Sequence, residues 1–93
     1  MNMAMIASWL NIEEEHVVEA LQDAGRKLDG IGREVVLDFS SVRRIDPGVV
    51  RAMEEFSGIA DDKGVKVALR GLNVDVYKVL KLVKLASRFT FVN

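Results

Sequence analysis

The sequence predicts a small α/β domain in which four strands and three helices alternate, with the strands forming one mostly parallel sheet in a single layer. Three kinds of observation support this: apolar runs of strand length, amphipathic stretches between them, and capping or glycine signals at the junctions. Helices between successive strands favour parallel pairing. At 93 residues, the whole chain (1–93) is expected to form a single domain around one core.

The first strand and the first helix are predicted in the N-terminal third. The apolar run from Met3 to Leu10 has no capping residues, which favours a strand over the alternative of a buried helical turn. Asn11 and Glu14 have the spacing of a capping box, so a helix is expected to begin there. Its inner stripe consists of Val17, Leu21, Ala24 and Leu28, and its outer face of Glu15, Glu19, Gln22 and Arg26.

A buried central strand and the second helix follow. After Gly30 and Gly32, the β-branched and aromatic run from Val35 to Phe39 is typical of such a strand. Asp46-Pro47 predicts a helix start, because the carboxylate can accept from the free N–H groups of the first turn and proline lacks an N–H that would be left unpaired. Helical spacing assigns to the core Val49, Met53, Phe56 and Ala60, while Arg51 and Glu55 can pair outside.

The C-terminal third repeats the alternation. Gly64 ends the second helix, a strand is predicted from Val65 to Leu69, and Arg70-Gly71 turns the chain. Asn73 is placed to cap a third helix. The inner stripe of this helix consists of Val76, Leu80 and Val83. The fourth strand is predicted at residues 89–92.

Composition and motifs exclude several functions. The net charge of -1 provides no overall field that would attract nucleic acid, and the apolar start is too short to enter a membrane. The absence of cysteine fits a cytoplasmic protein. The single His16, beside Glu13 to Glu15, is better explained by a solvated helix face than by a metal site or a catalytic triad. We therefore expect neither an enzyme nor a cofactor.

The segment SSVRRIDPG is the most unusual in the chain, although it lacks the glycine spacing of a nucleotide-binding loop. It brings Ser40, Ser41, Arg43 and Arg44 to a helix N-terminus, where an anion or a phosphorylated partner could dock. Alternatively, Asp46 caps the helix, Val42 and Ile45 anchor the loop, and the arginines are solvated. Trp9 could likewise cover the sheet or lie in an interface.

From Val35 onward the chain resembles the STAS domain of anti-sigma-factor antagonists. The matching stretch is VVLDFSSVRRIDPGVV, followed by the strand VKVAL, the turn Arg70-Gly71-Leu72 and the helix from Val74. The helix from Asn11 to Leu28 fits the family's first helix, although the usual pair of preceding strands is reduced to one. The resemblance covers roughly the last two-thirds of the chain well.

The resemblance implies a binding function without the family's phosphoserine switch. Family members bind an anti-sigma factor or a serine-kinase-like protein through the loop and helix around an Asp that Asp46 matches, and phosphorylation of the next Ser turns binding off. Pro47 and Gly48 occupy the hydroxyl positions here. The nearby hydroxyls that could accept a phosphoryl group instead belong to Ser40, Ser41 and Ser57. The implied partner-binding residues are Arg43, Arg44, Asp46, Pro47, Gly48, Val49, Val50 and Arg51.

Other functions remain as alternatives. The chain could be a STAS scaffold subunit of a lipid- or anion-transport assembly, or, with less support, a nucleotide-binding domain. A second copy of the chain could also cover an exposed sheet edge by strand pairing, which would make a homodimer.

Overall fold

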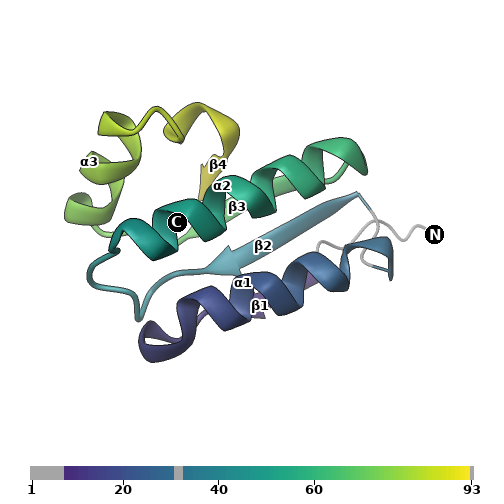
Figure 1. The fold of residues 1–93 in the computed structure, drawn as a ribbon, viewed down its shortest axis with the longest axis horizontal. Coiled ribbons are helices and arrows are strands. Elements are labelled where there is room, and N and C mark those ends of the chain that lie inside the picture. The colour runs from purple at the N-terminus through teal and green to yellow at the C-terminus, as the bar shows by residue number, and fades with distance from the viewer. Residues whose placement is uncertain (1–7, 31–32, 93) are drawn as a thin grey trace.

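The computed structural model describes residues 8–30 and 33–92 and confirms the predicted order of elements (Figure 1). Its strands are β1 (Ser8–Asn11), β2 (Glu34–Asp38), β3 (Lys66–Arg70) and β4 (Thr90–Val92). Its helices are α1 (Val17–Arg26), α2 (Pro47–Asp62) and α3 (Val74–Leu82). Short 3-10 turns are η1 (Glu14–His16), η2 (Leu28–Gly30) and η3 (Ala86–Arg88). Residues 3–7 of the predicted first strand lie outside the described residues.

The four strands form one sheet in the order β1-β2-β3-β4, and all three pairings are parallel. Leu37 pairs with Leu10 on one side and with Leu69 on the other, so β2 is a central strand as predicted. Helices α1 and α2 lie together in front of the sheet, while α3 lies toward one end (Figure 1). The predicted fold class is therefore confirmed.

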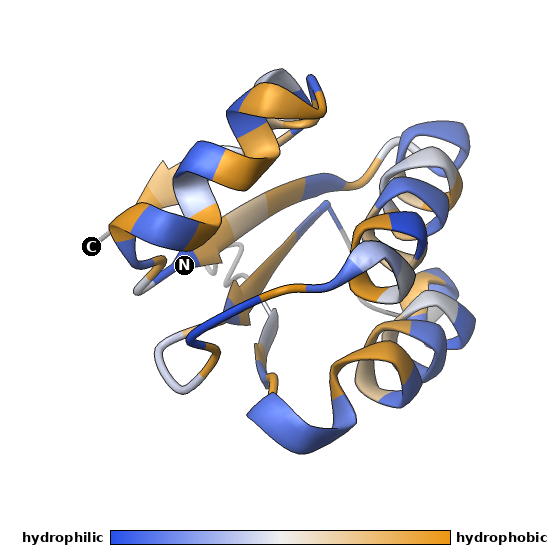
Figure 2. Ribbon diagram, turned by 60° about the vertical axis from the view of Figure 1, so that its left-hand side comes forward, coloured by the Kyte–Doolittle hydropathy of each residue, from blue (hydrophilic) through white to orange (hydrophobic). Residues whose placement is uncertain are grey.

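The core lies between the sheet and the predicted inner faces of the helices. Val35, Leu37 and Phe39 are each 0% exposed, and the helical stripes that pack with them are buried as their spacing predicts, with the exception of Val83. Met53 and Phe56 belong to this core, as predicted. In Figure 2 the central strands are largely orange, whereas the helices are banded in blue and orange, as expected for elements with one solvated face.

The predicted capping box at Asn11 is wrong. Asn11 is the last residue of β1, and the next amide, that of Ile12, donates to the Asp38 carbonyl at 3.0 Å. The chain thus stays in the sheet where a helix start was predicted. It then passes through η1 before α1 begins at Val17, and neither helix start has a side-chain cap.

The predicted core position of Val83 is also wrong. Helix α3 ends at Leu82, and Lys84 adopts a left-handed conformation with φ 64°, which turns the chain. Val83 is left 42% exposed, and Leu85, whose amide donates to the Leu80 carbonyl at 2.8 Å, is buried in its place.

Two glycines with positive φ provide a matched test of the turn after β3. Gly64 (φ 69°) faces open space, whereas a Cβ on Gly71 (φ 73°) would lie 2.6 Å from Ser40 Oγ and 3.1 Å from Ser40 Cα. Gly64→Ala is expected to lower the free energy of unfolding by about 1–2 kcal/mol, the cost of placing an L-residue in a left-handed conformation. Gly71→Ala should lower the free energy of unfolding further, as measured by urea denaturation, because its Cβ also clashes with Ser40. Equal losses in the two variants would contradict the close approach of Gly71 to Ser40.

Candidate functional site

The candidate site is the loop between β2 and α2, residues 39–46, together with the first turn of α2. Two buried side chains anchor the loop: Phe39 is 0% exposed and Val42 is 1% exposed. The Phe39 amide donates to the Arg70 carbonyl at 2.8 Å, and the Val42 amide donates to the Phe39 carbonyl at 2.9 Å. Val42 therefore anchors the loop as predicted, and Ile45 packs against the core as a partly buried residue.

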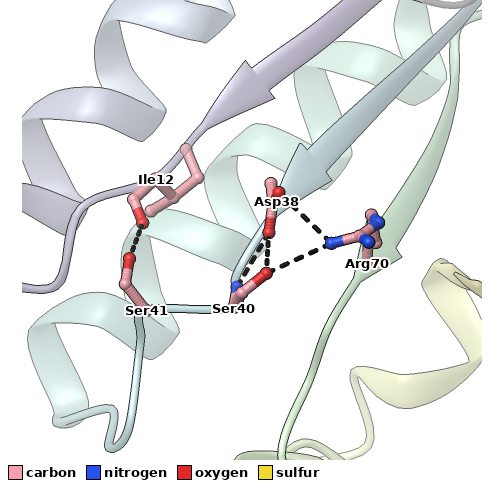
Figure 3. A network of polar contacts seen from close by, with 5 residues as sticks. All are labelled: Ile12, Asp38, Ser40, Ser41 and Arg70. Atoms are coloured by element: carbon pink, nitrogen blue, oxygen red, sulfur yellow. Dashed lines mark hydrogen bonds and ion pairs between the residues drawn. The ribbon is translucent and has the colours of Figure 1, made fainter. Parts of the chain in front are cut away.

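Hydrogen bonds to other parts of the chain hold the loop in place. Ser41 Oγ donates to the Ile12 carbonyl at 3.1 Å (Figure 3), and a Glu14 carboxylate oxygen accepts from the Arg43 amide at 3.3 Å. From the other side, Asn73 Nδ2 donates to the carbonyls of Arg43 at 3.0 Å and Val42 at 3.3 Å. These bonds fix the loop before any partner arrives.

Asn73 serves two purposes at once. Its Oδ1 accepts from the Val76 amide at 2.8 Å, which confirms the predicted cap of α3, while its amide nitrogen holds the loop. Because a carboxamide carries both an acceptor and donors, one side chain can join the start of α3 to the segment before α2. The cap was readable from sequence spacing, but the bond to the loop was not.

The first turn of α2 is capped from within. Asp46 Oδ1 accepts from the Val49 amide at 2.9 Å, and Pro47 occupies the first helical position, as predicted. The Asp46 carboxylate thus supplies the negative charge that the helix N-terminus favours. The geometry supports the capping interpretation of this junction over an anion docked on the helix end.

Three arginines surround this helix start with exposed side chains, Arg43, Arg44 and Arg51. Within residues 8–30 and 33–92, no hydrogen bond or ion pair engages their guanidinium groups, and the expected pairing of Arg51 with Glu55 is not formed. Pro47 and Gly48 are also exposed, whereas Val49 is buried and Val50 half-buried. Of the predicted partner-binding residues, the accessible ones are therefore the arginines and the Asp46-Pro47-Gly48 corner.

A second polar cluster lies beside the loop at the ends of β2 and β3 (Figure 3). Asp38 accepts from the Ser40 amide at 2.9 Å and from the Ser40 hydroxyl, and Arg70 Nη1 lies 3.4 Å from the other Asp38 carboxylate oxygen. The same Arg70 nitrogen donates to Ser40 Oγ at 3.3 Å. Sequence analysis missed this cluster, because Asp38 and Arg70 are distant along the chain and only the sheet register joins them.

This environment stabilises the ionised form of Asp38. The pKa of its carboxyl group is lowered chiefly by the hydrogen bond from the Ser40 hydroxyl, then by the Ser40 amide, with Arg70 adding a smaller attraction. Arg70 also lies 5.2 Å from the ring centroid of Trp9, in the geometry of a cation–π contact. Trp9 itself is 55% exposed.

The three candidate serines differ in accessibility. Ser40 and Ser41 are exposed, and their hydroxyls bond to Asp38 and to the Ile12 carbonyl. Ser57 is only 5% exposed; its hydroxyl donates to the Glu54 carbonyl at 2.9 Å and accepts from Arg88 at 3.2 Å. Modification of Ser57 would require α2 to open locally.

Two other features of the sequence can be compared with the structure. His16 is exposed, and the described residues contain no group of three or more metal-ligating side chains. Among the same residues, no helix is long and apolar enough to cross a bilayer.

Comparisons with known proteins agree with this architecture. Residues 14–92 match the family model described as Mlab, STAS domain. The NMR structure of the protein TM1081 gives a TM-score of 0.74 at 20% identity, covering 91% of this chain and 72% of that one. A crystal structure of the same protein, a candidate anti-sigma factor antagonist from Thermotoga maritima, gives 0.67 at 24% identity, covering 96% and 75%.

A chain from the stressosome, a signal integration and transduction hub, gives a TM-score of 0.70 at 25% identity, covering 97% of this chain and 86% of that one. No curated protein sequence matches the chain significantly.

The lowered pKa of Asp38 predicts a pH-dependent stability. Because the folded pKa lies below the ordinary value of about 3.9, the ionised form stabilises the fold above that value and this contribution is lost as pH falls through the folded pKa. Asp38→Asn should reduce the free energy of unfolding at pH 7 by roughly 1.5 kcal/mol. In urea denaturation, the difference in free energy of unfolding between the wild type and Asp38→Asn should shrink at the lowest pH values.

The matched control is Asp23→Asn on α1, whose carboxylate contacts Arg26 and Lys27 in exposed ion pairs. Such pairs are screened by solvent, so this variant should change stability little. If the loss of unfolding free energy in Asp38→Asn stays constant down to the lowest pH, the stabilising role assigned to the Asp38 charge is contradicted.

The double role of Asn73 predicts that its two functions can be separated. Asn73→Asp keeps an acceptor for the Val76 amide but loses the donor to the loop carbonyls, whereas Asn73→Ala loses both. In hydrogen exchange followed by NMR, Asn73→Asp should speed exchange of the Val42 and Arg43 amides while the Val76 amide stays protected. Asn73→Ala should expose all three amides. Unchanged loop protection in Asn73→Asp would show that the loop does not depend on this bond.

Proposed function

The chain belongs to the STAS domain family, and we propose that it is a non-enzymatic regulatory module that binds a protein partner through the loop and helix start after β2. The proposed partner class is an anti-sigma factor or a serine-kinase-like signalling protein. The observation that carries the proposal is the fixed loop: its Ser41 side chain bonds to Ile12, and its backbone bonds to the side chains of Glu14 and Asn73. Within residues 8–30 and 33–92, the guanidinium groups of Arg43, Arg44 and Arg51 make no such bonds.

A loop that is already ordered is suited to binding. Association normally costs free energy for ordering loops and side chains at the interface, and a segment fixed beforehand avoids part of that cost. The bonds to this loop come from three separate segments: the residue after β1, the start of η1 and the residue before α3. The conformation offered to a partner is therefore set by the fold itself.

The charge of this surface favours an acidic counterpart. Arg43, Arg44 and Arg51 provide three guanidinium groups, and arginine is enriched in protein interfaces because its planar fork can bind a carboxylate bidentately. Complementary charge would also speed the encounter and help to exclude wrong partners. Asp46 remains committed to its own helix as the cap.

Binding by this surface is proposed to be constitutive or to be regulated at another residue. Pro47 and Gly48 carry no hydroxyl group that could accept a phosphoryl group beside Asp46. Ser40 and Ser41 are the exposed hydroxyls nearby. A phosphoryl group on Ser41 would remove its donor to Ile12, and one on Ser40 would place like charge against Asp38.

The surface is tested by reversing its charge. Arg44→Glu/Arg51→Glu should weaken binding to a captured partner by about tenfold or more, equivalent to roughly 1.4 kcal/mol. Partners are captured with the wild-type protein, identified by mass spectrometry, purified and titrated by calorimetry. The control, Lys27→Glu/Lys63→Glu, reverses the same number of charges just beyond the ends of α1 and α2 and should leave the affinity unchanged.

Unchanged affinity of every captured partner for the arginine variant would sink the proposed surface. Phosphatase treatment before titration separates constitutive binding, which it leaves unaltered, from regulation through Ser40 or Ser41. Capture of transport subunits in place of a kinase or an anti-sigma factor would favour the alternative of a scaffold in a lipid- or anion-transport assembly.

A further inference from the structure

The exposed apolar side chains are concentrated in one region of the described chain. Of the eight large apolar residues with substantial exposure, only Trp9 and Ile59 lie elsewhere. The other six are on or beside α3 and β4: Val74, Tyr77, Leu82, Val83, Phe91 and Val92. Leu82 is 80% exposed and Val74 is 66% exposed, so this region presents far more apolar surface than isolated exposed residues would.

Helix α3 has one face that packs in the core and a second face that carries both apolar and positively charged side chains. Val76 and Leu80 are buried, and helical spacing consequently places Lys78 and Lys81 on the outer side, with Tyr77 between that side and the core face. The Tyr77 and Phe91 rings meet edge to face, 5.3 Å apart at an interplanar angle of 83°. Lys81 Nζ lies 5.9 Å from the centre of the Tyr77 ring. The apolar groups on this face are thus interleaved with positive charge.

The surface is hollowed on both sides of Tyr77. A groove of about 360 Å³ runs between the start of α3 and the end of β4, lined chiefly by apolar residues that include Leu72, Val74, Tyr77 and Phe91. A shallower hollow of about 570 Å³ is lined by Tyr77, Lys78, Lys81 and Leu82. Recessed apolar surface with a few polar groups suits the insertion of a side chain.

Strand β4 adds a free backbone edge. It pairs with β3 on one side only and ends the strand order, so among the described residues its other side has no strand partner. All three of its residues are exposed. An open edge of this kind is a template for pairing with another segment.

We propose that this α3–β4 face is a second docking surface, which binds an acidic amphipathic segment of a protein partner. An apolar side chain of that segment occupies the groove beside Tyr77 and Phe91, and its carboxylates face Lys78, Lys81 and Lys84. The grooves and the strand edge favour a protein segment over a lipid surface, because a bilayer contacts protruding groups and offers no strand to pair. This surface shares no residue with the Arg43–Arg51 surface.

The test selects ligands directly from a phage-displayed random peptide library on the folded wild-type protein. The selected peptides should combine large apolar residues with Asp or Glu. Their affinity should fall about tenfold or more for Tyr77→Ala, as expected for an aromatic anchor, and similarly for Lys78→Glu/Lys81→Glu. Ile59→Ala is the matched control, because Ile59 and Tyr77 are both 39% exposed and Ile59 lies on α2. Arg44→Glu/Arg51→Glu should leave peptide binding unchanged.

Several results would overturn the proposal. One is a peptide pool without acidic enrichment; another is binding that is indifferent to Tyr77→Ala in a variant shown to be folded by urea denaturation. Vesicles containing phosphatidylglycerol would identify a lipid surface if they bind the wild type but not the lysine variant. Self-association in sedimentation that is lost in Tyr77→Ala would identify a second copy as the occupant. Loss of peptide binding in the arginine variant alone would assign the peptides to the other surface.

Discussion

The departure of the chain from the sheet after β2 is the constraint on which the rest of the site depends. Phe39 is fully buried, and its amide extends the pairing with β3 by one residue through the Arg70 carbonyl. The next residues leave the sheet from a fixed point and reach the capped start of α2 within one short loop. Because parallel strands end at the same edge, the loop meets the Ile12 carbonyl after β1 and the side chains of Asp38 and Arg70 at the ends of β2 and β3. The fold and the candidate binding surface therefore share one origin.

Most of the fold could be predicted because its signals are local. The caps at Asp46 and Asn73, the buried stripes and the central strand each depend on residues within a few positions of one another. The prediction failed where tertiary structure competed with a local signal. Glu14 had the spacing to cap a helix, but its carboxylate accepts from Arg43, 29 positions away. The loop proposed as the candidate site was chosen from sequence alone, whereas the bonds that hold it join distant residues whose proximity no single sequence reveals.

Like charges are grouped along this chain although they nearly cancel in the composition, and the acidic group meets the arginine loop at Glu14. The acidic run from Glu13 to Glu15 is exposed before α1, while arginines gather at the start of α2 and lysines on α3. A net charge of -1 conceals this arrangement. Such a distribution orients an approaching macromolecule even when the whole molecule attracts it weakly. The two basic regions differ in character, since the loop surface is polar and ordered by hydrogen bonds whereas α3 and β4 mix lysines with apolar side chains.

The position of Trp9 gives the protein an optical reporter of its own. The sequence contains one tryptophan, and its indole ring lies against the Arg70 guanidinium group, which also contacts Asp38 and Ser40. Indole emission is sensitive to neighbouring charge and to solvent, and this ring is both exposed and adjacent to the segment that begins the loop. Movements at this edge of the sheet are thereby coupled to an intrinsic fluorescence signal from a single site, with no label attached to either surface.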